Sequence, residues 1–544
     1  MTSQTEIELK FLVPAASRAG IATEMARGAA TPERMSLAAR YLDTDDRRLA
    51  QERIAWRLRR EGRGWIQTLK AGGANALERF EHEVVRPDAS HDASQHAGTP
   101  VGDRLIAILR RASADGLQPA VRFETEVRRT ARRVRTRGAV VEVAFDEGRL
   151  LAAGSSQRIR EIEFELIAGS SAALLTLAER WRRRFGLIYD PRSKSERGDR
   201  LAEGSPFPPL RKAGQPRYPD DATAAEAFAA VLDECLAQIT RNAIGLIEGD
   251  PGLRVEHVHQ LRVGIRRIRS AQRCFQGWAP SPPADLVEGL RSLFAALGMA
   301  RDSDVLDSGV MVDLAKVGAP RLTLPAGHAG PDPVKTVRAA DSQQTFLAWI
   351  AWRATLADEP GEGVDAIVAG PQGEASSPAA GDAQASDVRP SDGGPHSPHR
   401  TETGAVASQT GHDDAPTFHR DVERRLRQWH RRIIADSDSF DELDEAGLHA
   451  LRKRIKRQRY AVEFFAPVLR RRKAARYLNA VAAMQDRMGE LNDLFVARAR
   501  YQSLVESDPA AWFALGWLAA RIAQVCKRAK RELGQLAKAD PPTS

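Results

Sequence analysis

The chain has 544 residues, of which 42% are hydrophobic and 28% charged, with a formal net charge of +9. This length exceeds one compact core, so we expect two or three domains, and the basic balance favours acidic partners. The three cysteines, Cys235, Cys274 and Cys526, are far apart and form no CxxC pair, which argues against a disulfide framework or a zinc site. The first residues do not resemble a signal peptide, and no run of about 18 apolar residues predicts a membrane span. We therefore expect a cytoplasmic protein.

Residues 5–200 have the pattern of short alternating strands with a few helices. The first strand, residues 6–11, reads EIELKF, so its charged side chains share one face and its apolar side chains the other. Taken alone, this segment is better explained as an edge strand with one solvated face.

The same alternation recurs along the region, and the charges sort by sign. The charged positions that share a phase are Arg57, Arg59, Lys70, Arg79, Glu81, Glu83, Arg129, Glu142, Asp146, Glu161, Glu163 and Glu165. A closed barrel with a charged interior and an apolar exterior under helices fits this pattern. Glutamates facing arginines and lysines could bind a hard divalent cation together with phosphate oxygens.

These residues resemble the CYTH domain, the fold of the triphosphate tunnel metalloenzymes. The resemblance begins at Glu6-x-Glu8-x-Lys10 and continues through YLDT at 41–44, TLK at 68–70, Arg79-x-Glu81-x-Glu83, ExExE at 161–165 and KSERG at 194–198. It implies an eight-stranded antiparallel tunnel that takes a linear triphosphate with Mg²⁺ or Mn²⁺.

The resemblance also assigns roles by position. The implied metal ligands are Glu6, Glu8, Glu163 and Glu165. The implied phosphate path is lined by Lys10, Arg57, Arg59, Lys70, Arg129, Lys194 and Arg197. Arg128 is an alternative to Arg129, and Glu142, Asp146 and Glu161 either support the ligands or are solvated.

Residues 170–187 form the clearest helix of this half, with Leu174, Leu177 and Trp181 at helical spacing. The stretch 201–221 is rich in Pro, Gly and charge and has the composition of a linker. From Ala222 to Leu536 every periodic segment is helical.

One stretch of this helical half, residues 358–416, lacks apolar periodicity. No aromatic residue occurs between Trp352 and Phe418, and Gly, Ala, Ser, Pro, Asp and His dominate. Such a segment buries too little apolar surface to offset its ordering entropy, so we expect a disordered insert. Its histidines, His396, His399 and His412, are best explained as solvated linker residues.

The helical half contains an internal repeat. His259, Arg262, Arg266 and Arg269 correspond to His449, Arg452, Lys456 and Arg459 at a constant offset of 190 positions. A second motif follows each, Leu297-Gly298 with Arg301-Asp302, and Met488-Gly489 with Asn492-Asp493. We therefore expect two similar helical units, separated by the insert.

In both units the basic residues are three and four apart, which places them along one helix face. Acidic partners at i+4 are nearly absent, so the like charges repel one another unless a polyanion neutralises them. A merely solvated face, with ordinary helix histidines, is the plain alternative. Nucleic acid is the competing polyanion. Apart from Tyr460, however, these two basic helix faces, called the basic stripes below, carry few aromatic side chains for stacking, which favours polyphosphate.

Residues 222–537 resemble the CHAD domain on the motifs HxxRVxxRR at 259–267 and LGxxRDxDV at 297–305. This resemblance implies two pseudo-symmetric helical bundles whose basic surfaces bind inorganic polyphosphate. The long insert departs from a compact example of the family.

The predicted fold class is α+β, with an eight-stranded antiparallel β-tunnel in 1–203, a linker in 204–221 and an all-α domain in 222–537. The predicted function is metal-dependent hydrolysis of inorganic triphosphate to pyrophosphate and phosphate, with longer polyphosphate bound by the helical domain and a location that includes polyphosphate granules. Adenylate cyclase or thiamine triphosphatase activity is one alternative, and a non-catalytic polyphosphate-binding protein is another. Nucleic acid and membrane are not expected partners, and the oligomeric state stays open.

Overall fold

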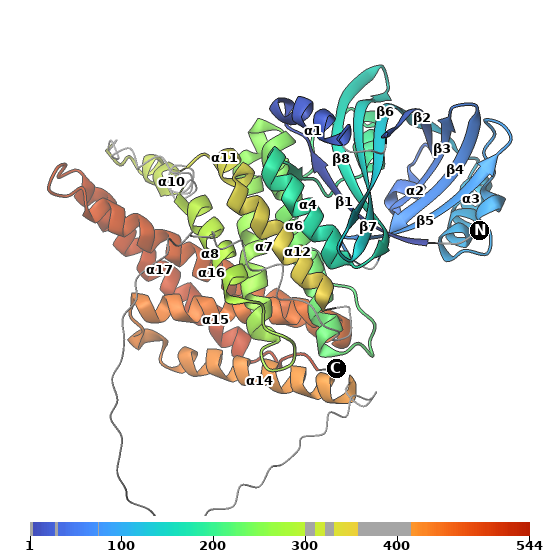
Figure 1. Ribbon diagram of the computed structural model, residues 1–544. Coiled ribbons are helices and arrows are strands. Elements are labelled where there is room, and N and C mark those ends of the chain that lie inside the picture. The colour runs from blue at the N-terminus through green and yellow to red at the C-terminus, as the bar shows by residue number, and fades with distance from the viewer. Residues whose placement is uncertain are drawn as a thin grey trace, which may run out of the picture.

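The computed structural model describes residues 4–27, 31–73, 75–299, 310–320, 331–356 and 415–543. Residues 358–414 of the predicted insert lie outside these ranges, with His396, His399 and His412, and so does the Arg301-Asp302 motif. Figure 1 shows a barrel of strands and a larger helical region side by side, with α4 (Ser171–Phe185) between them.

The N-terminal region is a closed antiparallel barrel. Its strands are β1 (Gln4–Leu12), β2 (Glu33–Asp43), β3 (Ile54–Glu61), β4 (Gly64–Gly72), β5 (Glu78–Arg86), β6 (Ala120–Thr136), β7 (Ala139–Ala152) and β8 (Ser155–Gly169). The order is β5-β4-β3-β2-β6-β7-β8-β1, and β1 closes the barrel by pairing with β5 as well as β8. The predicted eight-stranded antiparallel barrel is confirmed. A ninth strand of two residues, β9 (Ile188–Tyr189), pairs with the end of β1.

The other elements of this region are short helices around the barrel. They are η1 (Ala15–Ser17), α1 (Arg18–Met25), α2 (Arg48–Gln51), η2 (Ala93–His96), α3 (Pro100–Ala114), α4 and α5 (Lys194–Ala202). The predicted helix at 170–187 is α4: the Ser170 hydroxyl accepts a hydrogen bond from the Ala173 amide, and Gly186 ends the helix at a φ of 59°. Its predicted apolar face is buried, and the Trp181 ring packs edge-on against Phe164 of β8.

The second region is all helical in the part of the chain that the structure describes, as predicted. Its α-helices are α6 (Ala224–Glu248), α7 (Arg254–Cys274), α8 (Ala284–Met299), α10 (Val310–Lys316), α11 (Pro333–Arg338), α12 (Ala340–Thr355), α14 (Ala415–Asp438), α15 (Glu445–Phe464), α16 (Arg471–Gln502) and α17 (Ala511–Ala537). Short 3-10 turns are η3 (Pro251–Leu253), η4 (Phe440–Glu442) and η5 (Ala466–Val468). Within the described ranges, no helix combines the length and apolar character that crossing a membrane requires.

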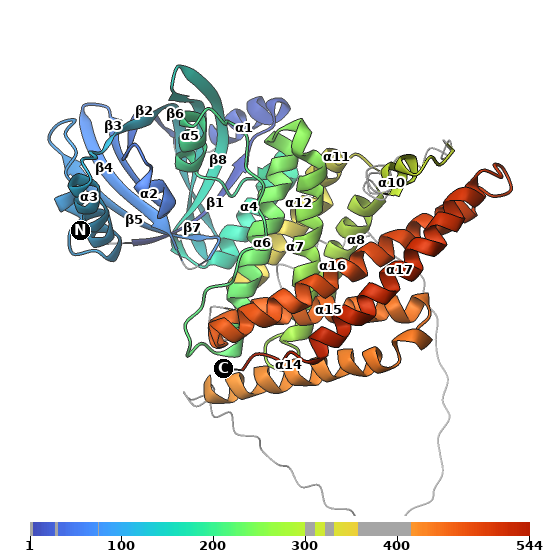
Figure 2. The ribbon, with the colours of Figure 1, turned by 180° about the vertical axis from the view of Figure 1, so that it is seen from behind.

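The two repeats occupy equivalent places in the helical region. α7 carries the first basic motif and packs on the preceding helix α6, and α15 carries the second and packs on the preceding helix α14. The repeats meet where α7 contacts α15. Figure 2 shows α14, α15, α16 and α17 running across the ends of the α6, α7 and α12 bundle.

One hydrophobic core connects the barrel and the helical region. It contains Phe11 and Phe164 from the outer face of the barrel, Trp181 from α4, and Phe228 and Trp349 from the helical region. α4 lies on β8 on one side and contacts α12 on the other. The predicted linker therefore joins two units that share a packed apolar interface.

Candidate active site in the barrel lumen

Strand alternation sorts the β1 side chains as the sequence predicts. Glu6, Glu8 and Lys10 are buried, while Leu9 and Phe11 point to the opposite face and join the apolar core. The register sets Glu8 opposite Glu165 and Lys10 opposite Glu163 on β8. The barrel thereby brings carboxylates and ammonium groups from different strands into one lumen.

Three carboxylates form a compact group in this lumen: Asp146 of β7 with Glu161 and Glu163 of β8. One oxygen from each lies within 4.8 Å of the others. Asp146 and Glu161 are fully buried, so the alternative that they are solvated is wrong. The group satisfies the distance requirement for a metal site.

Three cations already neutralise this group. Lys194 Nζ lies 2.7 Å from Asp146, 2.5 Å from Glu161 and 2.8 Å from Glu163. Arg129 donates to Asp146 at 2.7 and 2.8 Å, and Arg197 donates to Glu161 at 2.8 Å. Burial opposes the charge on Lys194, but the three carboxylates outweigh it and hold the Lys194 pKa well above its ordinary value. We therefore regard this group as a means of positioning cations in the lumen.

A second acidic group consists of Glu6 and Glu8 of β1 with Glu165 of β8. Lys70 donates to Glu6 at 2.8 Å, and Arg79 lies 2.8 Å from Glu8. Glu165, in contrast, makes no hydrogen bond or ion pair among the described residues.

The lack of a partner affects the charge on Glu165. Burial, the carboxylate of Glu6 and those of Glu142 and Glu81 raise the Glu165 pKa to about 8, against the opposing effect of Lys70. Negative charge is thus in excess here, and a bound divalent cation would relieve it. Of the four predicted metal ligands, Glu6, Glu8 and Glu165 belong to this group, whereas Glu163 is held by Lys194 and Arg129.

Arg57 and Arg59 of β3 line the lumen with their guanidinium groups. The Arg57 guanidinium is 3.9 Å from Glu81 and 3.8 Å from Glu83, and that of Arg59 is 3.4 Å from Glu83. Among the described residues, the buried Nε atoms of Arg57 and Arg59 have no hydrogen-bond acceptor. Burial and the neighbouring Arg57 lower the Arg59 pKa. Unsatisfied buried donors of this kind are suited to phosphate oxygens.

α5 packs against β6, β7 and β8 and carries two of the predicted residues. The Ser193 hydroxyl accepts from the Glu196 amide and starts the helix, which directs Lys194 and Arg197 toward the β8 carboxylates. Gly198 is required here, because a Cβ atom would lie 2.1 Å from the Phe123 ring. Phe123 stacks on Tyr41 with 4.4 Å between ring centroids, and both rings belong to an apolar cluster that includes Leu201 of α5.

The helical region contacts the segments that carry these residues. Arg241 of α6 donates to both carboxylate oxygens of Glu196, one of them at 3.0 Å. Gln343 of α12 accepts a hydrogen bond from the Tyr189 amide at 2.9 Å, and the next amide, that of Asp190, donates to the Lys10 carbonyl at 3.0 Å. Helices outside the barrel therefore help to fix both ends of segment 189–196, which carries Lys194.

The structure settles the predicted choice between Arg128 and Arg129. Arg129 points into the lumen and pairs with Asp146 and Glu163, whereas Arg128 is exposed on the outer face. Sequence reasoning left out Arg79 as a site residue, although its alternation with Glu81 was visible. It gave no signal for Asp190, a buried carboxylate that binds Arg192 twice at 2.8 Å.

The predicted basic stripes meet between the two repeats. Burial lowers the Arg452 pKa of α15, and Arg266 of α7 lowers it further, against the effect of Asp493. The Arg262 guanidinium lies 4.6 Å above the Phe294 ring and donates to the Leu297 carbonyl at 3.3 Å.

Other stripe residues have local partners. Arg452 and His449 each contact the Asn492 side-chain oxygen, at 3.1 and 3.2 Å. Arg459 pairs with Glu463 at i+4, at 2.8 Å, so the expectation that acidic partners are nearly absent is wrong at that position. His259, Lys456 and Arg269 lie half-buried on the same faces.

An antiparallel barrel with a charged lumen, joined to an all-α region with paired basic helices, defines the class. The CYTH domain family matches residues 4–198, and the CHAD domain family matches residues 230–502. The chain belongs to the proteins that join a CYTH domain to a CHAD domain.

The chain is also similar to individual proteins. An inorganic triphosphatase of Haemophilus influenzae is 29% identical over 163 residues, which are 29% of this chain and 44% of that protein. The chain thus spans less than half the length of this curated relative. The crystal structure of the CHAD domain from Ricinus communis is 27% identical, covers 59% of this chain and 96% of that chain, and gives a TM-score of 0.40. The crystal structure of the inorganic triphosphatase NE1496 is 20% identical, covers 31% and 80%, and gives 0.14.

Proposed function

We propose that the barrel hydrolyses inorganic triphosphate to pyrophosphate and phosphate with a divalent cation, Mg²⁺ or Mn²⁺. The observation that carries the proposal is that one lumen contains both an unpaired carboxylate and unsatisfied arginine donors. Among the described residues, Glu165 makes no ion pair or hydrogen bond, and the buried Nε atoms of Arg57 and Arg59 have no acceptor. A metal–phosphate complex supplies both at once.

Glu6, Glu8 and Glu165 fit a hard cation because they offer oxygen ligands in a region of excess negative charge. Glu163, the fourth predicted ligand, would contribute once Lys194 and Arg129 exchange it for phosphate oxygens. A cation bound at these carboxylates supplies charge neutralisation at the phosphates and a coordinated water of lowered pKa.

The remaining lumen residues would bind and align the phosphate chain. Lys10, Arg57, Arg59 and Lys70 present positive charge to the reacting phosphates, and Arg129, Lys194 and Arg197 do so along the rest of the path. Phosphoryl transfer needs positioning and charge neutralisation more than covalent help from the protein. Lysine and arginine side chains can supply both.

Phosphate release from tripolyphosphate, ATP and thiamine triphosphate, each with Mg²⁺ or Mn²⁺, tests the proposal. We expect tripolyphosphate to be the best substrate and Glu6→Gln to abolish turnover, with Glu33→Gln, an exposed carboxylate on β2, as the matched control. Cyclic AMP from ATP would establish the cyclase alternative. Absence of turnover on all three would establish the non-catalytic alternative.

We further propose that the basic faces of α7 and α15 bind longer inorganic polyphosphate. Like charges brought together by burial, as at Arg266 and Arg452, support a polyanion ligand. The variant Arg262→Gln/Arg266→Gln/Arg452→Gln should bind polyphosphate more weakly than Arg431→Gln, which changes an exposed arginine of α14. Single-stranded RNA that binds more tightly than polyphosphate would contradict the choice of ligand. The cytoplasmic location, at polyphosphate granules, stays a prediction.

A further inference from the structure

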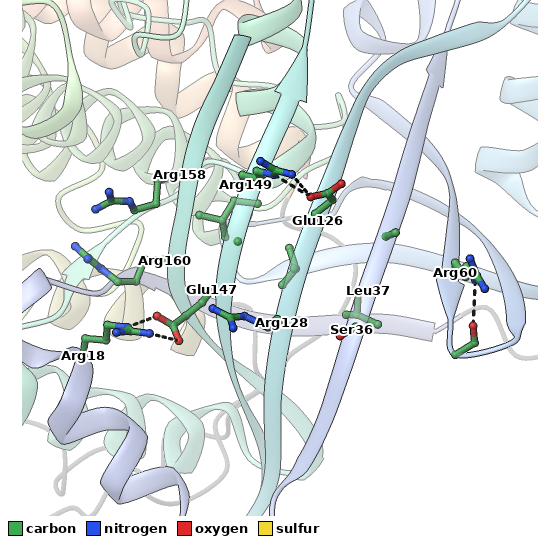
Figure 3. Close-up of a pocket in the computed structure, with 15 residues that line it drawn as sticks. Arg18, Ser36, Leu37, Arg60, Glu126, Arg128, Glu147, Arg149, Arg158 and Arg160 are labelled. Carbon is green, nitrogen blue, oxygen red and sulfur yellow. Dashed lines mark hydrogen bonds and ion pairs between the residues drawn. The ribbon is translucent and has the colours of Figure 1, made fainter. Parts of the chain in front are cut away.

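A groove with a cavity volume of about 890 Å³ lies on the outer face of the barrel wall, across β2, β6, β7 and β8. Figure 3 shows its charged side chains on neighbouring strands. Six arginines line it: Arg18, Arg60, Arg128, Arg149, Arg158 and Arg160. Because strand side chains alternate, Arg128 and Arg160 point outward while the next residues, Arg129 and Glu161, point into the lumen. The groove is therefore separate from the candidate active site.

The strand register arranges the groove as two rows of charge. In one row Glu147 of β7 stands between Arg128 of β6 and Arg160 of β8. In the other, Arg149 of β7 stands between Glu126 of β6 and Arg158 of β8, so that two arginines are direct neighbours. Like charges placed directly opposite each other on a sheet face are destabilising. If the face were only solvated, this repulsion would lower the stability of the sheet without any compensating interaction.

Most of the arginines have partners within the protein. Arg18 binds Glu147, and Arg149 donates to Glu126 at 2.8 Å. Arg160 donates to the Val13 carbonyl at 2.7 Å, and Arg60 to the Gly62 carbonyl at 3.1 Å.

Two guanidinium groups differ from these. Within the described residues, the exposed side chains of Arg128 and Arg158 make no hydrogen bond, ion pair or ring contact. The groove has little side-chain bulk on β2, where Ser36 lies opposite Arg128 and Ala38 opposite Glu126, and between the rows on β7, where Gly148 lies. The groove thus combines open space with two guanidinium groups that have no partner among the described residues.

We propose that this groove is a second binding site for a linear inorganic phosphate chain, outside the tunnel. Six arginines against two glutamates give it an excess of positive charge, and guanidinium forks match phosphate oxygens. Successive groups along a strand face are about 6.6 Å apart and neighbouring strands about 4.8 Å, so an extended chain can meet several forks. None of the described residues that line the groove is aromatic, so these residues offer no stacking surface of the kind that single-stranded nucleic acid uses. The proposal shares its ligand class with the proposed function but requires no hydrolysis.

Arginine-specific modification with phenylglyoxal, read by mass spectrometry on the full chain, tests this site residue by residue. The reaction is run in EDTA, with and without medium-chain polyphosphate, so that turnover plays no part. We expect polyphosphate to slow modification of Arg128 and Arg158 several-fold and to leave Arg183, an exposed arginine of α4, unchanged. Equal modification of Arg128 and Arg158 with and without polyphosphate overturns the proposal, even where arginines of α7 and α15 are protected. Protection by single-stranded RNA but not by polyphosphate overturns it as well.

A variant provides an independent measurement. In the background Arg262→Gln/Arg266→Gln/Arg452→Gln, which weakens the helical stripes, residual polyphosphate binding should fall several-fold on adding Arg128→Gln/Arg158→Gln. Adding Arg183→Gln instead should leave it unchanged, and a thermal melt confirms that each protein is folded. Residual binding that is the same in both variants contradicts a site in the groove.

Discussion

The lumen of the barrel and the basic faces of α7 and α15 are both rich in charge, but they use it differently. In the lumen, acidic and basic side chains lie together away from solvent, so carboxylates hold Lys194, Arg129 and Lys70 in place. On the helices, arginines lie beside other arginines and are only half-buried. The first arrangement fixes positions, as the proposed catalysis requires, whereas the second would suit the proposed polymer in many registers.

The largest effect should come from removing the central cation of the lumen. Lys194→Met leaves three buried carboxylates with less compensation, so we expect loss of measurable tripolyphosphate turnover and a stability loss of about 3–5 kcal/mol. Phosphate release and urea denaturation measure the two effects. Lys212→Met, at an exposed linker lysine, is the control. A stable and active Lys194→Met protein would show that the lumen charges are not coupled.

The next effect concerns His96, a buried histidine of η2 that packs against β5 of the barrel and has no counterpart in the basic stripes. His96 contacts His82 and Gln67 and is fully buried, and its other charged neighbours are Asp92 and Arg86. Burial and His82 lower the His96 pKa to about 4.

The sign of the pH dependence follows from this shift. The unfolded chain takes up a proton near pH 6.5, and the folded protein only near pH 4, so stability is lost as the pH falls between these values. We expect about 1–2 kcal/mol less stability at pH 5 than at pH 7.5 from this residue. Urea denaturation at the two pH values measures it. His96→Gln should reduce this difference, and an unchanged difference in that variant would assign the pH dependence elsewhere.

A smaller effect should connect the two regions. Arg241→Glu places like charges against Glu196 and disturbs the start of α5, so we expect turnover to fall by about tenfold, within the range of coupling between sites. Glu196→Arg should reduce turnover similarly, and the double exchange should restore most of it. A double variant no better than either single variant would mean that the contact does not position α5. The exposed Arg183→Gln serves as control.

The smallest effect is expected on the helical stripes, where charge is spread over many residues. Arg266→Gln should weaken polyphosphate binding only several-fold and reduce the slope of log affinity against log salt by about 1. Affinity measured at several salt concentrations tests both. An all-or-none loss from this one change would mean that the helical site is as tightly specified as the lumen.

The barrel strands and their inward residues were predictable because the two-residue period is a local property of the chain. It placed Glu6, Glu8 and Lys10 on one face, and the structure agrees. The neutralisation of Asp146 and Glu161 was not predictable, since it depends on where α5 packs and hence on Lys194 and Arg197.

The same distinction holds for the helical region. The basic stripes followed from helical spacing, but the approach of Arg266 to Arg452 depends on how α7 meets α15. The contacts of Arg241 with Glu196 and of Gln343 with Tyr189 join positions 45 and 154 residues apart. No local pattern reports such pairs.

The apolar core shared by the two regions has a consequence for how the protein can be divided. A fragment ending after α5 would expose the face of α4 that now rests on α12, including part of the surface around Trp181. Exposed apolar area of this kind favours aggregation and costs the fragment the burial that holds α4 in place. Shortening the chain to the barrel thus calls for polar replacements on that face, and the intact protein should melt in one cooperative step.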